Sequence, residues 1–283
     1  MMKFTKLQAT GNDFILIEAD RMRRDWAKLS QAMCDRRFGV GSDGLILLLK
    51  SKVADFRMRM FNPDGSEAEV CGNGLRCFAR YVVSSGLADA RRGITIETSA
   101  GIKTAVPQDR GSRFQVDMGE PRFRPEDLPV AVTVNRVPMV DYPVNVAGQK
   151  LRLTFVSMGN PHGVCFVDDV GEFTLCDIGP RVEHHELFPR RVNFEIAHVV
   201  SRREIDARVW ERGAGETLSC GTGACAIAVA ARLHDYVDDR VDIKLPGGTL
   251  SVKWDRKGSV YLTGPAELVF TGDWPDRKPS EDK

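Results

Sequence analysis

Residues 220–233, Cys-Gly-Thr-Gly-Ala-Cys-Ala-Ile-Ala-Val-Ala-Ala-Arg-Leu, decide the fold of this chain. After the Gly-x-Gly turn nearly every side chain is apolar, so a helix formed here has no polar face to turn toward water. Such a helix must be buried on all sides. The rest of the chain consists mainly of short alternating or apolar runs that are typical of strands. The stretch therefore predicts a central helix enclosed by a strand-rich shell.

The same signature occurs a second time at residues 71–77, Cys-Gly-Asn-Gly-Leu-Arg-Cys, 149 positions earlier in the chain. Further landmarks recur in the same order at a shift of 148 to 150 residues. They are Gly11-Asn12 with Gly159-Asn160, Asp43 with Asn193, and Asn62 with Glu211. Asn62 lies nine residues before the first cysteine of the signature, and Glu211 lies nine residues before the second. A repeat of this length indicates two duplicated domains rather than a short-period solenoid.

The predicted elements favour an α+β fold of two pseudo-symmetric domains, each a strand-rich, barrel-like sheet around a central helix. Helical spacing of apolar residues predicts helices at residues 25–37, 74–86 and 221–233. Strands are predicted at residues 14–18, 45–49, 56–61, 93–98, 114–118, 151–156, 205–210, 241–245 and 259–263. The turn signal Gly119-Glu120-Pro121 predicts the boundary between the domains.

Composition and charge narrow the class of partner. The 283 residues include 40 Lys and Arg against 39 Asp and Glu, a net charge of +1, which predicts no basic surface for nucleic acid or membrane. The sequence shows no apolar run of the length that a signal peptide or a spanning helix needs. We therefore expect a cytoplasmic protein whose partner is a small molecule.

The cysteines fall into two groups. Seven of them, an odd number, favour free thiols over a disulfide framework in a chain of this size. No Cys-x-x-Cys pair occurs, so we expect no metal site. The cysteines expected to be buried structural residues are Cys34, Cys77, Cys165, Cys176 and Cys225. Cys71 and Cys220 differ, because both stand directly before a Gly-x-Gly turn.

The two Cys-Gly turns together predict acid–base chemistry at a carbon atom. The start of a helix leaves N–H groups without intrahelical partners and favours negative charge, so each turn suits a carboxylate and a thiolate. If the two turns face each other across a domain cleft, one thiolate removes an α-proton while the opposing thiol protonates the other face. The N–H groups expected to stabilise the charge in the carboxylate belong to Gly72, Asn73, Gly221 and Thr222. We expect no cofactor.

These motifs resemble those of the diaminopimelate epimerase family. The resemblance runs from residue 9 to about residue 270 and rests on Ala9-Thr-Gly-Asn-Asp-Phe14, Asn62-Pro-Asp-Gly-Ser66, residues 71–77, Gly159-Asn-Pro-His162, Arg191-Val-Asn193 and residues 211–225. It implies interconversion of LL- and meso-diaminopimelate without pyridoxal phosphate, on the route to lysine and peptidoglycan. It also implies an active site in the cleft between two similar domains, of residues 1–119 plus 265–283 and of residues 120–264.

The resemblance implies a role for each matched residue. Cys71 and Cys220 are the acid–base thiols, and His162 and Glu211 tune their pKa values. The residues that bind substrate are Asn12, Asn62, Gly72, Asn73, Asn160, Asn193, Glu211, Arg212, Gly221 and Thr222. Among these, Glu211 and Arg212 read the distal ammonium and carboxylate of a double-ended amino acid. At Gly44 the chain departs from the family pattern, since many members carry Gln there.

Two other functions fit the same residues. One is a different cofactor-independent racemase, for example one that acts on proline, although Glu211 and Arg212 favour a substrate with a second charged end. The other is a catalytically silent amino-acid-binding or thiol-redox protein, against which the two retained cysteines argue. A homodimer is the expected assembly.

Overall fold

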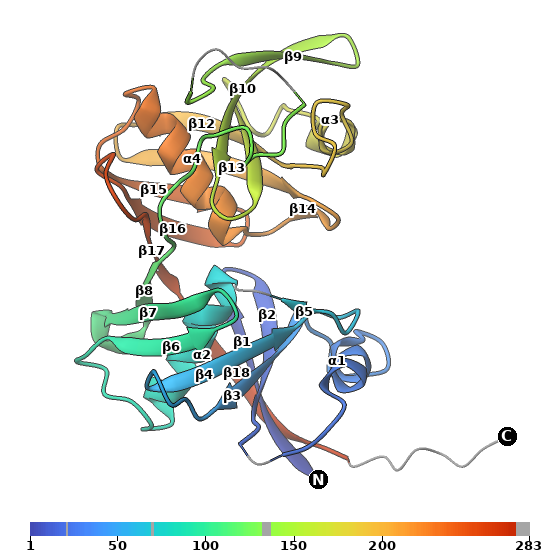
Figure 1. The fold of residues 1–283 in the computed structure, drawn as a ribbon, viewed down its shortest axis with the longest axis vertical. Coiled ribbons are helices and arrows are strands. Elements are labelled where there is room, and N and C mark those ends of the chain that lie inside the picture. The colour runs from blue at the N-terminus through green and yellow to red at the C-terminus, as the bar shows by residue number, and fades with distance from the viewer. Residues whose placement is uncertain (21, 69–70, 132–136, 276–283) are drawn as a thin grey trace, which may run out of the picture. The chain divides into compact units, whose positions relative to one another are not determined.

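The computed structural model of the chain describes residues 1–20, 22–68, 71–131 and 137–275. The chain divides into two compact units, one comprising Met1–Val116 and the segment that begins at Pro265, the other Asp117–Gly264. Figure 1 shows the first unit in blue and teal with its last strand in red. Within the described residues, no helix combines the length and the apolar character that crossing a membrane requires.

The first unit contains one mixed sheet in the order β18-β1-β2-β3-β4-β6-β7-β8. Its strands are β1 (Met2–Ala9), β2 (Asn12–Glu18), β3 (Gly44–Leu49), β4 (Phe56–Phe61), β5 (Glu67–Ala68), β6 (Ile94–Thr98), β7 (Gly101–Gln108), β8 (Arg113–Asp117) and β18 (Glu267–Trp274). Its helices are α1 (Trp26–Cys34), α2 (Gly72–Ser84) and the short 3-10 helix η1 (Asp109–Gly111). The last strand, β18, pairs with β1 from Trp274 opposite Met2 to Glu267 opposite Gln8.

The second unit contains a sheet in the order β9-β10-β11-β12-β13-β15-β16-β17. Its strands are β9 (Tyr142–Val146), β10 (Gln149–Ser157), β11 (Pro161–Phe166), β12 (Asn193–Ser201), β13 (Glu204–Glu211), β14 (Gly215–Thr217), β15 (Arg240–Leu245), β16 (Gly248–Lys253) and β17 (Tyr261–Pro265). Its helices are α3 (Leu175–Glu183) and α4 (Gly221–Leu233).

The two units repeat one plan. Strand β2 pairs parallel with β3 and β11 with β12, and a helix, α1 or α3, connects the two strands of each pair. The parallel pairs β4–β6 and β13–β15 are likewise connected through α2 and α4. A parallel pair needs such a crossover, so each parallel pairing fixes the place of a helix. The pseudo-symmetric α+β class expected from the sequence is confirmed.

The helix that follows each Cys-Gly turn is the central one. Helix α4 is buried along nearly all its length and packs against β10, β11, β12, β15 and β16. Helix α2 packs against β1, β2, β3, β7 and β18. These strands come from both ends of their sheets, so each sheet curls around its helix, as α4 in Figure 1 shows. The central helices expected from the sequence are confirmed.

Helix α1 is shorter than the sequence pattern predicts. It ends at Cys34 instead of residue 37, because the Asp35 carboxylate accepts the N–H groups of Arg37 and Phe38, each at 2.7 Å, and begins a turn. Phe38, which continues the helical spacing of Trp26, Leu29 and Met33, lies beyond the helix and is 82% exposed. The prediction for this end of the helix is therefore wrong.

Two further differences concern helix boundaries and number. Helix α2 begins at Gly72, two residues before the predicted start, because Cys71 is its N-cap. Helix α3 is not predicted from the sequence at all. It contains Pro180, and it packs on the outer side of its sheet against β12, β13 and β14.

Candidate active site

The first Cys-Gly turn forms the start of α2. Cys71 is the N-cap, with an extended backbone (φ −132°, ψ 124°), and Gly72 and Asn73 are the first two helical residues. The N–H groups of a first helical turn have no intrahelical acceptors, and they lie at the positive end of the helix dipole. Packing requires Gly74, since a Cβ atom there would lie 3.1 Å from the sulfur of Met60. The turn presents a half-buried thiol beside donors that suit an anion.

The side chain of Asn12 lies against this thiol. Its Nδ2 donates to Asp43 Oδ2 at 2.6 Å, which leaves Oδ1 facing the turn. Asn12 Oδ1 accepts from Asn73 Nδ2 at 3.2 Å and from the Cys71 thiol at 3.9 Å. The amide oxygen of Asn12 is thus held toward the sulfur.

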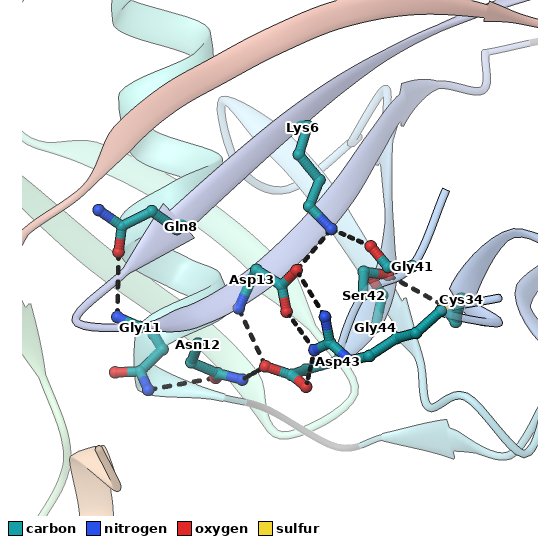
Figure 2. A network of polar contacts seen from close by, with 12 residues as sticks. Lys6, Gln8, Gly11, Asn12, Asp13, Cys34, Gly41, Ser42, Asp43 and Gly44 are labelled. Atoms are coloured by element: carbon teal, nitrogen blue, oxygen red, sulfur yellow. Dashed lines mark hydrogen bonds and ion pairs between the residues drawn. The ribbon is translucent and has the colours of Figure 1, made fainter. Parts of the chain in front are cut away.

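A network of charged side chains, shown in Figure 2, holds the Asn12 amide through Asp43. Arg36 donates to Asp43 Oδ1 and to Asp13 Oδ1, both at 2.7 Å, and Lys6 bonds Asp13 and the Gly41 carbonyl oxygen. Burial would raise the pKa of Asp13, but the hydrogen bonds from Arg36 and Lys6 outweigh it and lower that pKa to about 2. Asp13 is therefore ionised at any physiological pH.

Two more positions of the first unit bear on the site. The side chain of Asn62, in the turn after β4, donates to Ser66 Oγ at 2.9 Å. Gly44 pairs with Phe14 across β2 and β3, and a Cβ atom there would lie 3.1 Å from the Phe61 carbonyl oxygen. Position 44 is thus closely surrounded by backbone and ring atoms, and a longer side chain there needs a local shift.

Cys220 takes the same place before α4 (φ −119°, ψ 117°). Its Sγ accepts the N–H of Gly223 at 3.4 Å and lies 3.4 Å from Thr222 Oγ1. Burial raises the pKa of the Cys220 thiol well above its usual value, and nearby Glu211 raises it further. The hydrogen bonds from Thr222 and Gly223 offset only part of this. These effects favour the thiol form of Cys220 at neutral pH.

A chain of buried polar groups leads to Asn160 in the second unit. Glu195 Oε1 lies 2.6 Å from His162 Nδ1, and His162 Nε2 lies 3.0 Å from Asn160 Oδ1. Asn160 Nδ2 in turn donates to Thr222 Oγ1 at 3.3 Å. Because the Asn160 nitrogen is used by Thr222, its oxygen accepts, and the His162 Nε2 carries a proton.

The remaining candidates lie at the start of β12 and at the end of β13. Asn193 is buried, donates to the Pro161 carbonyl oxygen and accepts the Arg212 N–H, both at 2.9 Å. Glu211 accepts from Thr217 Oγ1 at 2.6 Å. The Arg212 side chain is exposed and donates to the Arg190 carbonyl oxygen at 3.2 Å. Asn193 thus ties the start of β11 to the backbone that presents Arg212.

Within each unit the structure brings most of the predicted residues together. In the first unit Asn12 contacts both Asn73 and Cys71, and in the second Asn160 bonds Thr222, which lies 3.4 Å from the Cys220 sulfur. Glu211 is near enough for its charge to raise the pKa of Cys220. Sequence patterns did not reveal the residues that orient the two Asn amides, chiefly Asp43 and Glu195. For Glu195 a signal exists, because it interrupts the apolar run Asn193-Phe-Glu-Ile-Ala197 of a buried strand.

The other cysteines are free thiols. Cys34, Cys77, Cys165 and Cys225 are buried, which agrees with a structural role. Cys176 was predicted to be buried, and this prediction is wrong. It is exposed on α3, and its thiol donates to Glu216 Oε2 at 3.1 Å. Glu216 raises the pKa of the Cys176 thiol.

Comparisons with known proteins bear on the whole chain. The sequence model of the family described as diaminopimelate epimerase matches residues 4–124 and 154–269. A diaminopimelate epimerase of Moorella thermoacetica is 49% identical, over 97% of this chain and 99% of the relative. One of Methanococcus maripaludis is 45% identical, over 96% of this chain and 99% of the relative.

Solved structures share the fold at lower identity. A phenazine biosynthesis protein of the PhzF family from Bacillus anthracis matches with a TM-score of 0.69 and 19% identity, covering 96% of this chain and 98% of that one. A probable proline racemase from Agrobacterium radiobacter also matches with a TM-score of 0.69, at 14% identity, covering 98% of this chain and 94% of that one. At such identities the likeness concerns the fold alone.

Proposed function

Because this chain belongs to the diaminopimelate epimerase family, we propose that Cys71 and Cys220 are the acid and base of its reaction and that their neighbours bind the substrate. The chain is an isomerase that epimerises diaminopimelate between the LL and meso forms, a step of lysine biosynthesis. The family resemblance of the sequence motifs is confirmed. No observation favours a proline racemase or a silent binding protein instead.

The equivalence of the two thiol turns carries the proposal. Both cysteines are N-caps of the central helix of their unit, and both have an extended backbone followed by Gly-x-Gly. Each therefore combines a thiol with the N–H groups of a helix start, which bind a carboxylate. A reaction that inverts a carbon centre needs one proton acceptor and one donor on opposite faces, and two such turns supply them.

The reaction consists of two proton transfers, one on each side of the substrate's α-carbon. In one direction of the reaction, the thiolate of Cys71 takes the α-proton of the substrate, and the C–H electron pair passes into the carboxylate. The Cys220 S–H then protonates the opposite face of the carbon atom, which leaves Cys71 as thiol and Cys220 as thiolate. The reverse reaction starts from that state. Because both steps are proton transfers, we propose no cofactor.

The backbone and amide donors stabilise the intermediate between these steps. Charge that leaves the α-carbon accumulates on the carboxylate oxygens, where donors act in a site shielded from water. We assign this task to the N–H groups of Gly72, Asn73, Gly221 and Thr222. The amides of Asn12 and Asn160 bind the reacting end, while Asn62 and Asn193 shape the pocket around the substrate.

The loop after β13 is proposed to read the distal end of the substrate. Arg212 is exposed, and a guanidinium binds a carboxylate with two parallel hydrogen bonds. Glu211 attracts the distal ammonium group and, through its charge, raises the pKa of Cys220. His162 acts on the same turn through Asn160, which donates to Thr222. These roles explain why a substrate with two zwitterionic ends fits the site.

The test is an assay of reduced protein with LL-diaminopimelate in the absence of pyridoxal phosphate. We expect formation of the meso form, with L-proline left unchanged under the same conditions. Racemisation of proline would favour the alternative enzyme class, and no turnover of either amino acid by reduced, folded protein would contradict the proposal.

We also propose that the chain works in the cytoplasm as a homodimer. A reducing compartment keeps its seven cysteines as free thiols, two of which the reaction needs. For the dimer, Leu268, Val269 and Phe270 on β18 form a run of exposed apolar side chains that a second copy would cover. Val269→Asp should yield monomers in sedimentation experiments. A dimer unchanged by that substitution would refute this surface.

A further inference from the structure

Two buried positions behind the thiol turns differ in chemistry between the units. In the first unit the parallel strands β2 and β3 pair Phe14 with Gly44 and Leu16 with Ile46. In the second unit β11 and β12 pair His162 with Asn193 and Val164 with Glu195. The repeat therefore sets Phe14 against His162 and Ile46 against Glu195. An apolar pair in one unit corresponds to an imidazole and a carboxyl in the other.

Ile46 and Glu195 also occupy the same space relative to the helix turn. A Cβ atom added to Gly74 would lie 3.5 Å from Ile46 Cδ1, and one added to Gly223 would lie 3.1 Å from Glu195 Oε1. All four side chains of the two pairs are buried. The first unit shows that the fold packs this site with hydrocarbon, which avoids the cost of burying ionisable groups. The fold thus accommodates hydrocarbon at this place, and the ionisable pair of the second unit points to a role other than packing.

The geometry around Glu195 gives the pair another task. Its Oε1 lies 2.6 Å from His162 Nδ1, while its Oε2 is buried without a hydrogen-bond partner within the described structure. His162 Nε2 lies 3.0 Å from Asn160 Oδ1, and Asn160 Nδ2 donates to Thr222 Oγ1 at 3.3 Å. Each hydrogen bond in this series of side chains fixes the orientation of the next side chain, because every group has one donor or acceptor left for its neighbour.

We propose that Glu195 is a positioning residue for epimerisation: through His162 it keeps a proton on Nε2, and this N–H holds the Asn160 amide with its nitrogen toward Thr222 and the substrate carboxylate. The inference rests on the proposed two-thiol function. If Nε2 lost its proton it would become an acceptor, and the Asn160 amide would turn. Its oxygen would then face a carboxylate whose negative charge grows during the reaction.

The protonation of the pair depends on everything that faces Glu195. These groups are His162 on β11, Glu211 at the end of β13 and Cys220 at the start of α4. Burial raises the pKa of Glu195, the charge of His162 lowers it, and Glu211 raises it again. The pair holds one proton between Oε1 and Nδ1 and one on Nε2. When the Glu195 carboxyl loses its proton, the carboxylate accepts a hydrogen bond from Nδ1–H, and Nε2 of the neutral imidazole then lacks the N–H that Asn160 needs.

The main experiment moves the apolar pair of the first unit into the second. The variants are Glu195→Ile, His162→Phe and the double variant, measured as kcat/KM for LL-diaminopimelate. Each single variant should lower kcat/KM by roughly 10- to 100-fold, the effect of losing a hydrogen bond to a charged group. The double variant should lose no more than His162→Phe, because Glu195 acts through His162. Losses that multiply in the double variant would overturn the proposal.

A second variant covers the case that Glu195→Ile does not fold. Glu195→Gln keeps the shape and can donate to Nδ1, but it cannot titrate. In ¹⁵N NMR spectra His162 should keep its Nε2–H tautomer in Glu195→Gln, and the alkaline limb of the kcat/KM profile should move to higher pH. His234, which bonds Thr154 Oγ1 at 3.0 Å, serves as reference in the same spectra. A His162 tautomer and pH profile unchanged in all Glu195 variants would contradict the inference.

Two controls separate this inference from the proposed function. Glu204→Gln makes the same chemical change at a partly exposed ion pair with Lys244 and should leave kinetics and spectra unaltered. Cys71→Ala and Cys220→Ala test the thiols themselves. If the Cys variants lose epimerisation while Glu195 variants behave as wild type, only this inference fails. If the Cys variants remain active, the two-thiol function fails, and the His162 spectra still decide the role of Glu195.

Discussion

The two units place a thiol in the same way but support it by different means. In the first unit Asn12 turns its oxygen toward Cys71, and its nitrogen is held by Asp43 within a network that reaches the protein surface. In the second unit Asn160 donates its nitrogen to Thr222, which lies beside Cys220, and its oxygen is held by buried His162. Duplication kept the backbone, and the polar side chains diverged.

This difference makes a symmetric backbone chemically asymmetric. An amide oxygen beside Cys71 accepts a hydrogen bond from the thiol, whereas Cys220 accepts from the N–H of Gly223. The structure therefore distinguishes the two sulfur atoms, although the turns that carry them are equivalent. Substitutions in each unit can show which of these differences matter for the reaction.

The largest effect should come from the sulfur atoms themselves. Cys71→Ala and Cys220→Ala should each lower the rate of epimerisation by at least about 10³-fold, because each removes one of two positioned acid–base groups. Cys34→Ala, a matched change at a buried structural cysteine of α1, should retain most of the activity. Conversion of LL- to meso-diaminopimelate is the measurement. Equal losses in all three variants would mean that the two turns are not special.

The support of Asn12 should come next. Asp43→Asn removes the carboxylate that accepts the Asn12 amide at 2.6 Å, so kcat/KM should fall by roughly 10- to 100-fold. Asp89→Asn, at an exposed ion pair with Arg91, is the control and should not change the kinetics. A wild-type kcat/KM in Asp43→Asn would show that the first unit does not depend on this network.

The two thiols should also differ in reactivity. Cys71 is half-buried, whereas Cys220 is buried and its pKa is raised well above the usual value. In the absence of substrate, iodoacetamide should therefore modify Cys71 at least about tenfold faster than Cys220 near neutral pH, as followed by peptide mass spectrometry. Faster modification of Cys220 would contradict this difference between the two thiols.

The smallest effect concerns stability in acid. The pKa of Asp13 is lowered to about 2 in the folded chain, from an ordinary 3.8. Its ion pairs therefore stabilise the fold above pH 3.8 and are lost as the pH falls through 2. We expect urea unfolding to show a loss of about 1–2 kcal/mol between these limits, which Asp13→Asn should abolish. The corresponding position of the second unit is Pro161, which does not titrate. If Asp13→Asn shows the same dependence of stability on pH as the wild type, the loss of stability in acid comes from other groups.

Much of the fold follows from sequence patterns with one clear physical cause. The apolar run of α4 has no face that tolerates water, and it is buried as predicted. Helix α3 was not predicted because Pro180 lies inside it and its buried face contains only three apolar side chains, Leu175, Ile178 and Val182, beside Gly179 and Glu183. The length of α1 depended on Asp35, whose side chain prefers to bond the backbone of the next turn.

The site was predictable where a motif repeats and hidden where contacts join distant strands. The Cys-Gly turn occurs twice in the sequence, and Asn12 and Asn160 lie at matching positions of the repeat. The groups that orient those amides come from other strands, as Glu195 does for His162 at 2.6 Å, and no local spacing reveals that pairing. Only the parallel register of β11 and β12 brings the two side chains together.

The most direct test of the two-thiol account follows the solvent proton. Reduced protein is mixed with LL-diaminopimelate in D2O, and product and remaining substrate are analysed before the reaction has advanced far. If one thiol removes a proton and the other delivers one from solvent, the meso product should carry deuterium at its inverted α-carbon while the remaining LL form carries almost none. Deuterium in the recovered LL form at the same level as in the product would contradict the account, because it would mean that a single group removes and returns the proton.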